Sequence, residues 1–167
     1  MWRFLKGALL SVVTAAVLAP ACLGQDKNFS NWPAGTSPKE IGKRVAERFV
    51  SNPHTNFGQP GAPQYITYPE AVAWYGALTF AQLSDDKDLS TRLIQRFNLL
   101  FGPESNLVPV PDHVDRTVFG IVPLEIYVQT KDAKYLDLGK SMADKQWEKP
   151  TPEGLTDQTR FWIDNMS

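Results

Sequence analysis

Two short stretches of the sequence concentrate the side chains that could perform acid–base chemistry. The first, "PDHVDRT", places Asp112, His113, Asp115 and Arg116 within one short segment. A carboxylate at the start of a helix gains from the helix dipole and can accept backbone N–H bonds. Two interpretations of Asp112 and Asp115 therefore stand side by side: a helix cap, and a binding or catalytic group.

The second stretch, "RFWIDNM", places Asp164 close to Trp162 and Arg160. Apolar aromatic surroundings disfavour the charged form of an acid, so an aspartate held against an indole keeps its proton more readily. Asp164 is therefore a candidate general acid. The alternative is a capping or solvated aspartate.

Several aromatic residues lie where a loop is expected to meet a helix and could stack on sugar rings. Aromatic side chains within a helix are more typical of core packing, so Trp74 and Tyr75 are expected in the core. Tyr65 and Tyr68 remain candidates for binding.

Residue types and charge argue against metals, cofactors and nucleic acid. The two histidines, His54 and His113, lack H-E-x-x-H spacing, and no acidic cluster has the spacing of a calcium loop. Cys22 is the single cysteine, which leaves no internal disulfide. A net charge of −1 without a basic block predicts no nucleic-acid partner. We expect no cofactor and no metal, and the sequence leaves the oligomeric state open.

The N-terminal residues 1–24 have the layout of a secretory signal peptide. A short head with two basic residues precedes an apolar run that begins at Gly7 and is shorter than the ~20 residues of a membrane-spanning helix. The protein is therefore expected to be exported, without a membrane span in the mature chain. A lipid anchor on Cys22 and a retained anchor helix are the alternatives. The polar residues 25–36 are read as a linker or an N-terminal arm.

The rest of the chain, 37–167, predicts one domain built from helices. Ser37, Pro38 and Glu40 form a capping box at the start of a helix over 38–51. The Pro- and Gly-rich stretch that follows is a loop. Thr67 is then expected to cap a helix over 68–83 that is apolar enough to be buried on most of its surface.

Two pairs of expected helices are similar to each other at a spacing of 46 residues, because Leu78 falls on Leu124 and Asp86 on Asp132. Each pair has an apolar helix followed by an amphipathic one, and the second apolar helix is expected to begin near Thr117. Such a period predicts stacked helical hairpins. No credible strand is present, so the fold is expected to be all-α, with inner apolar and outer amphipathic helices alternating.

These stretches together resemble the N-terminal half of glycoside hydrolase families 88 and 105, the unsaturated glucuronyl and rhamnogalacturonyl hydrolases. The most specific stretch is "EGLTDQTRFWIDNM", compared with the pattern "DGLTxQTRFWxDDM". Glu153 and Asn165 depart from that pattern. The resemblance covers nearly all of residues 37–166.

This resemblance implies an (α/α)6 barrel, the six-hairpin glycosidase fold, of which about the first half would be present. It implies removal of a 4,5-unsaturated uronic acid from the non-reducing end of oligosaccharides made by polysaccharide lyases, such as pectin or rhamnogalacturonan fragments. By position Asp164 would be the general acid/base and Asp115 the second active-site aspartate. Trp162, Arg160, His113 and Tyr68 would be binding residues near them.

Two further readings stay open. A non-catalytic module of helical hairpins could bind saccharide or a partner protein through an exposed inner face. Another six-hairpin enzyme, such as a sugar epimerase, would be expected to use catalytic histidines. Because only part of a barrel is expected, we also expect little activity from this polypeptide alone.

Overall fold

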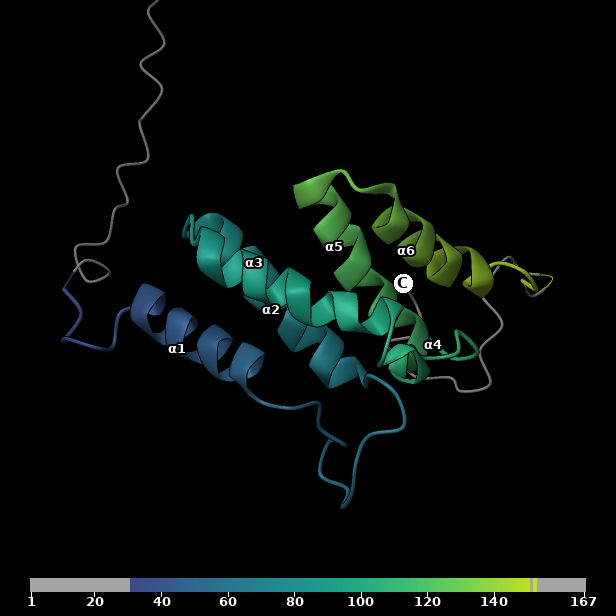
Figure 1. Ribbon diagram of the computed structural model, residues 1–167, viewed down its shortest axis with the longest axis horizontal. Coiled ribbons are helices and arrows are strands. Elements are labelled where there is room, and N and C mark those ends of the chain that lie inside the picture. The colour runs from purple at the N-terminus through teal and green to yellow at the C-terminus, as the bar shows by residue number, and fades with distance from the viewer. Residues whose placement is uncertain (1–30, 151, 153–167) are drawn as a thin grey trace, which may run out of the picture. The chain divides into compact units, whose positions relative to one another are not determined.

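The computed structural model describes residues 31–150 and residue 152 (Figure 1). The chain divides into an N-terminal unit, Met1–Trp32, and a second unit, Pro33–Ser167. Every helix of the described residues lies in the second unit, and these residues contain no strand. The described part of the chain is therefore all-α, as predicted.

The first helix, α1 (Pro38–Ser51), has the start and end that the sequence predicts. The Ser37 hydroxyl accepts a hydrogen bond from the backbone N–H of Glu40 at 3.2 Å. The Glu40 carboxylate in turn accepts one from the backbone N–H of Ser37 at 3.1 Å. This capping box satisfies two of the N–H groups that a helix leaves without intrahelical partners.

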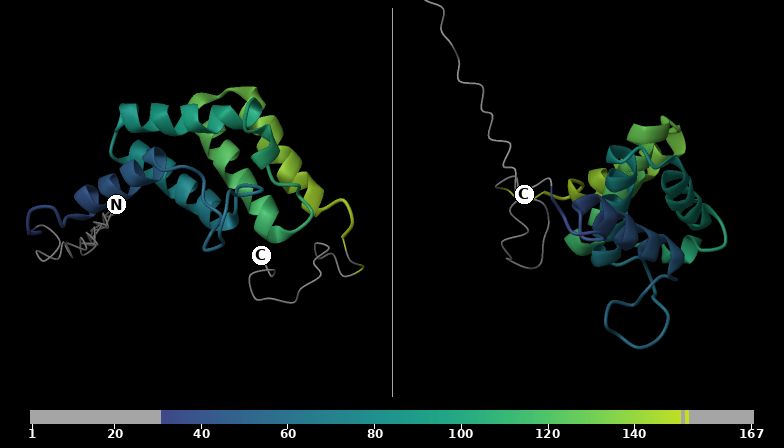
Figure 2. Two further views of the ribbon diagram at one scale, coloured as in Figure 1. Left: turned by 60° about the horizontal axis from the view of Figure 1, so that its bottom comes forward. Right: turned by 90° about the vertical axis from the view of Figure 1, so that its left-hand side faces the viewer.

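Two helical hairpins follow, and their second helices begin at the spacing seen in the sequence (Figure 1, Figure 2). Asp86 and Asp132 are the equivalent N-caps: their carboxylates accept from the backbone N–H groups of Leu89 at 3.1 Å and Lys134 at 3.2 Å. The helices of the hairpins are α2 (Tyr68–Leu83) with α3 (Lys87–Asn98), and α5 (Ile121–Thr130) with α6 (Ala133–Gln146).

The polypeptide before α5 does not form the continuous helix that the sequence suggests. It forms α4 (Val114–Thr117) and then a 3₁₀ turn, η4 (Val118–Gly120). Pro123 has no N–H to donate to the carbonyl of Phe119, which weakens an α-helix at this point. Two further 3₁₀ turns, η2 (Leu99–Phe101) and η3 (Ser105–Leu107), follow α3.

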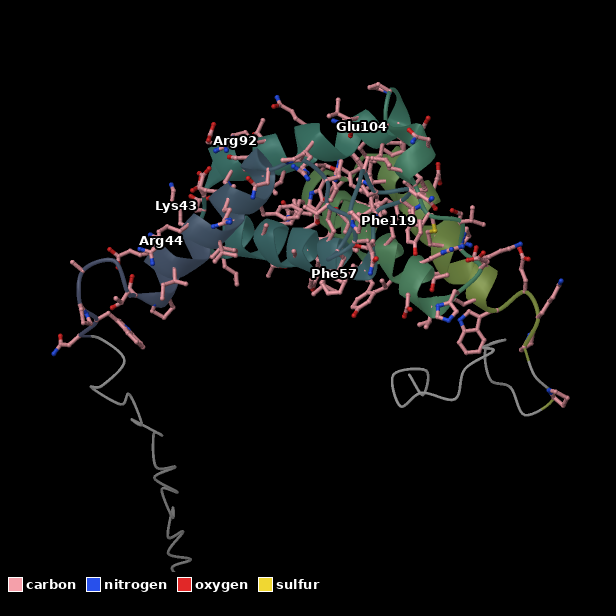
Figure 3. The ribbon with its side chains drawn as sticks, turned by 90° about the horizontal axis from the view of Figure 1, so that it is seen from below. Lys43, Arg44, Phe57, Arg92, Glu104 and Phe119 are labelled. Atoms are coloured by element: carbon pink, nitrogen blue, oxygen red, sulfur yellow. The ribbon has the colours of Figure 1, made fainter. Side chains whose placement is uncertain are left out.

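The core is built around α2, which contacts α1, α3 and α5. Trp74 is fully buried, and its indole N–H donates to the carbonyl oxygen of Leu93 at 3.3 Å. Its ring lies 5.6 Å from Phe49 of α1 and 5.4 Å from Phe97 of α3. Phe97 also stacks on Phe119, which lies among the packed side chains in Figure 3. The Phe97 ring also lies 5.9 Å from that of Tyr135 in α6, so one aromatic cluster links α1 with helices of both hairpins.

The expectation that α2 is buried on most of its surface is wrong. Val72 is 51% exposed, Tyr75 40% and Leu83 83%, so Tyr75 is not in the core. The described helices pack against the side of α2 that carries Trp74 and Leu78, and they leave the side that carries Val72 and Tyr75 open to solvent. No helix of the described residues is long and apolar enough to cross a lipid bilayer.

Candidate functional site

The residues of "PDHVDRT" lie at the start of α4, where His113 rather than an aspartate is the N-cap. The backbone N–H of Asp115 donates to His113 Nδ1 at 3.1 Å. The capping role considered for Asp112 and Asp115 is therefore wrong, because the extended backbone of His113 places its ring beside the exposed N–H groups of the first turn.

This hydrogen bond determines the tautomer of His113. A ring nitrogen that accepts a backbone N–H bond carries no proton, so the proton of the neutral ring lies on Nε2. Asp115 Oδ2 lies 3.6 Å from Nδ1, and the Asp115 side chain is 38% exposed. The Asp115 carboxylate thus lies beside a histidine and is reachable from solvent, which a substrate-binding acid requires.

Arg116 is already paired within the same segment. Its guanidinium donates to both carboxylate oxygens of Asp112, at 2.9 and 2.8 Å, and lies 4.7 Å from the centroid of the Tyr65 ring. Tyr65 first, and then Asp112, raise the pKa of Arg116 by hydrogen bonding. Asp112 and Arg116 therefore neutralise each other at one edge of the site.

A shallow hollow adjoins this segment where α4 meets the end of α6. The Gln146 side chain donates to the Thr117 hydroxyl and ties the two helices together. Lys145 is paired with Glu148. The hollow is lined by Asp112, His113, Thr117, Gln146 and Lys149, among others. The hollow therefore presents both positively and negatively charged side chains to a polar ligand.

The loop before α2 reaches the same region, although through Tyr65 rather than Tyr68. The backbone N–H of Ile66 donates to the carbonyl oxygen of Leu107 at 2.8 Å and joins the loop to the segment before α4. Tyr68 is 48% exposed, and its ring lies 6.2 Å from the ring of Phe57. The structure thus brings Tyr65, Arg116 and the acidic segment together.

The remaining candidates from the sequence, Asp164, Trp162 and Arg160, lie outside the described residues. Among residues 31–150 and 152, no group of three or more His, Cys, Asp or Glu side chains is placed to hold a metal ion.

A second polar cluster was not anticipated from the sequence. His54, from the loop before α2, lies between two carboxylates: Nδ1 is 2.5 Å from Glu70 Oε1, and Nε2 is 3.2 Å from Glu104 Oε2. Arg96 of α3 donates to the same Glu70 oxygen at 3.1 Å. The sequence signal that was overlooked is Glu70 itself, a charged residue in the first turn of a very apolar helix.

The surroundings of Glu70 keep this buried group ionised. Its side chain is only 5% exposed, and burial raises the pKa of the carboxyl. Hydrogen bonds and charge from His54, followed by those from Arg96, outweigh burial and bring the pKa below its ordinary value of 4.5. We call His54, Glu70, Arg96 and Glu104 the buried charge cluster.

Comparison of the chain with protein-family models, with curated proteins and with solved structures gave no significant match.

Proposed function

We propose that the chain supplies the first hairpins of an (α/α)6 barrel hydrolase that removes 4,5-unsaturated uronic acid from lyase-generated oligosaccharides of the pectin or rhamnogalacturonan type. The observation that carries the proposal is the stretch "EGLTDQTRFWIDNM" and its resemblance to glycoside hydrolase families 88 and 105. The all-helical hairpins and their spacing of 46 residues support it, since a barrel of this kind is built from such repeats.

In the proposed reaction Asp164 donates its proton to C4 of the substrate double bond. Water then adds its oxygen to C5 and returns a proton to the Asp164 carboxylate, so one water is consumed and the acid is regenerated. The hemiketal at C5 opens to a ketone, and the hemiacetal left at C1 expels the aglycone as an alcohol.

The proposed role of Asp115 is to hold the sugar and order the site. Its surroundings support this role, because the Asp115 carboxylate lies 3.6 Å from His113 Nδ1 at the start of α4 and its side chain is 38% exposed. Tyr65, at the edge of the same segment, is a better candidate than Tyr68 for a contact with the sugar.

The test is loss of the ultraviolet absorbance of the C4=C5 double bond in an unsaturated uronyl disaccharide. The assay uses this chain and its variants. We expect slow turnover by the chain alone. Asp164→Asn should abolish turnover, and Asp115→Asn should lower it by roughly 100-fold or more, the scale of a positioned acid–base or electrostatic group.

The matched control is Asp137→Asn, an aspartate on the exposed surface of α6 that should leave turnover unchanged. Turnover that survives Asp164→Asn contradicts the proposed mechanism. Saccharide binding without turnover, unchanged by Asp164→Asn, would instead favour the non-catalytic binding module.

A further inference from the structure

We infer that His54 is a doubly protonated, charged bridge that holds the loop between α1 and α2 to the first hairpin. This inference concerns the buried charge cluster and does not rest on the proposed function. It begins from the two ring nitrogens of His54, which face carboxylate oxygens on opposite sides.

An ionised carboxylate can only accept hydrogen bonds, so a ring nitrogen that faces one at hydrogen-bond distance must carry a proton. Nδ1 lies 2.5 Å from Glu70 Oε1, a distance at which two facing lone pairs would repel. Nε2 lies 3.2 Å from Glu104 Oε2. The neutral ring has one proton and can satisfy one of these contacts, whereas the imidazolium satisfies both.

Arg96 lies beside the same pair of groups, with its Nη2 3.1 Å from Glu70 Oε1 and also 3.1 Å from His54 Nδ1. A guanidinium can only donate, so with Nδ1 protonated the Glu70 oxygen accepts from both cations, and this shared anion has to offset their close approach. With His54 charged, two cations meet two carboxylates and the cluster is neutral. With His54 neutral the cluster would carry a net negative charge. That charge would be costly because the His54 side chain is only 9% exposed and the Glu70 side chain 5%.

The groups that face His54 come from three elements besides its own loop. Glu70 belongs to α2, Arg96 to α3, and Glu104 to the turn between η2 and η3, where Figure 3 labels it. The ring also lies 5.8 Å from the Trp74 indole. His54 therefore joins its loop to both helices of the first hairpin and to the segment that follows them.

Other contacts hold the loop as well, because Arg96 donates to the carbonyl oxygen of Asn52 and the Ile66 side chain is fully buried. The backbone N–H of Thr55 reaches Glu70 Oε2 at 3.4 Å, and that of Ile66 donates to the carbonyl oxygen of Leu107 at 2.8 Å. Tyr65, whose ring lies against Arg116, belongs to the same loop. Replacing the His54 ring removes both carboxylate contacts, so the loop and Tyr65 should become less firmly held.

The first measurement is the ¹⁵N NMR signals of the imidazole rings in the full chain at neutral pH. Only two histidines are present, and His113→Gln identifies the signals of His54. We expect both nitrogens of His54 to be protonated, and His113 to show an unprotonated Nδ1 with a protonated Nε2. An unprotonated nitrogen on His54 at neutral pH would overturn the inference.

The second measurement is hydrogen exchange of the Thr55 and Ile66 amides at neutral pH in the wild type and in His54→Gln. A hydrogen bond to a charged group contributes enough that its loss in His54→Gln should reduce loop protection about tenfold. His113→Gln is the control and should keep the wild-type protection. Equal protection in the wild type and His54→Gln would also overturn the inference.

Discussion

Glu70 shows how one buried side chain can hold several elements together. Its carboxylate accepts from His54 and Arg96, and the backbone N–H of Thr55 also points to it. Taking a carboxylate out of water is costly unless donors replace the water. Three donors do so here, which explains why an acid is compatible with the start of an apolar helix.

We predict that Glu70→Gln lowers the free energy of unfolding by about 3–5 kcal/mol, because it leaves the cationic partners of a buried pair without their anion. Urea denaturation measures this change. Glu47→Gln is the matched control: the Glu47 carboxylate pairs with Arg92 at 2.7 Å, but about a third of each side chain is exposed. The control should cost less than about 1 kcal/mol. Equal losses in the two variants would contradict the prediction.

The pairing of Glu70 with His54 and Arg96 also predicts that the free energy of unfolding depends on pH. Because the folded-state pKa lies below the ordinary 4.5, the contribution of Glu70 is fully present above that value. It is lost as pH falls from 4.5 through the lower folded-state pKa. The difference in unfolding free energy between wild type and Glu70→Gln should therefore shrink as the pH falls below 4.5.

At the scale of the elements, glycine allows the second hairpin to pack closely. A Cβ on Gly139 of α6 would lie 2.5 Å from the Leu124 side chain of α5 and 3.1 Å from the carbonyl oxygen of Gly120. The first hairpin has Leu93 at the equivalent position, which is buried. The two hairpins therefore share spacing but not the same packing between their helices.

We predict that Gly139→Ala destabilises the protein by about 1–3 kcal/mol, since the added methyl group forces α5 and α6 apart. The control is Gly76→Ala in α2, where a Cβ would meet no atom within 4 Å. Alanine loses less backbone entropy on folding, so this variant should gain roughly 0.5–1 kcal/mol. Thermal unfolding of both variants tests the sign of each effect, and a stabilising Gly139→Ala would show that the helices separate easily.

At the scale of the whole described molecule, Trp74 joins α1, α2 and α3, and Phe97 extends the same cluster to Phe119 before α5. A core without a break between its parts is expected to unfold in one transition. We predict that helix content, followed by circular dichroism, and tertiary packing, followed by tryptophan fluorescence, are lost together.

Trp74→Ala should lower stability by about 3–5 kcal/mol, as large-to-small substitutions of buried aromatic residues do. Trp147, at the C-cap of α6, is 56% exposed, so Trp147→Ala should change stability by less than about 0.5 kcal/mol. Two separate transitions in the wild type would mean that the hairpins are stable independently.

Much of the helical arrangement follows from local residues. The capping box of Ser37 and Glu40 and the spacing of 46 residues both predict helix positions that the structure confirms, and Asp86 and Asp132, which match at that spacing, are the N-caps of α3 and α6. These signals act within one or two turns of chain, so they can be recognised without knowing the neighbours. The chemistry assigned to Asp164 likewise comes from the sequence and stays a prediction.

Tertiary structure alone decided which side chains meet. His54 and Glu104 are 50 positions apart and come together through the packing of the first hairpin. The exposure of Tyr75 and the burial of Trp74 depend on which sides of α2 the other helices cover. Local propensity determines where a helix begins and ends, but burial and charge pairing depend on groups distant in sequence, which only the folded chain brings into contact.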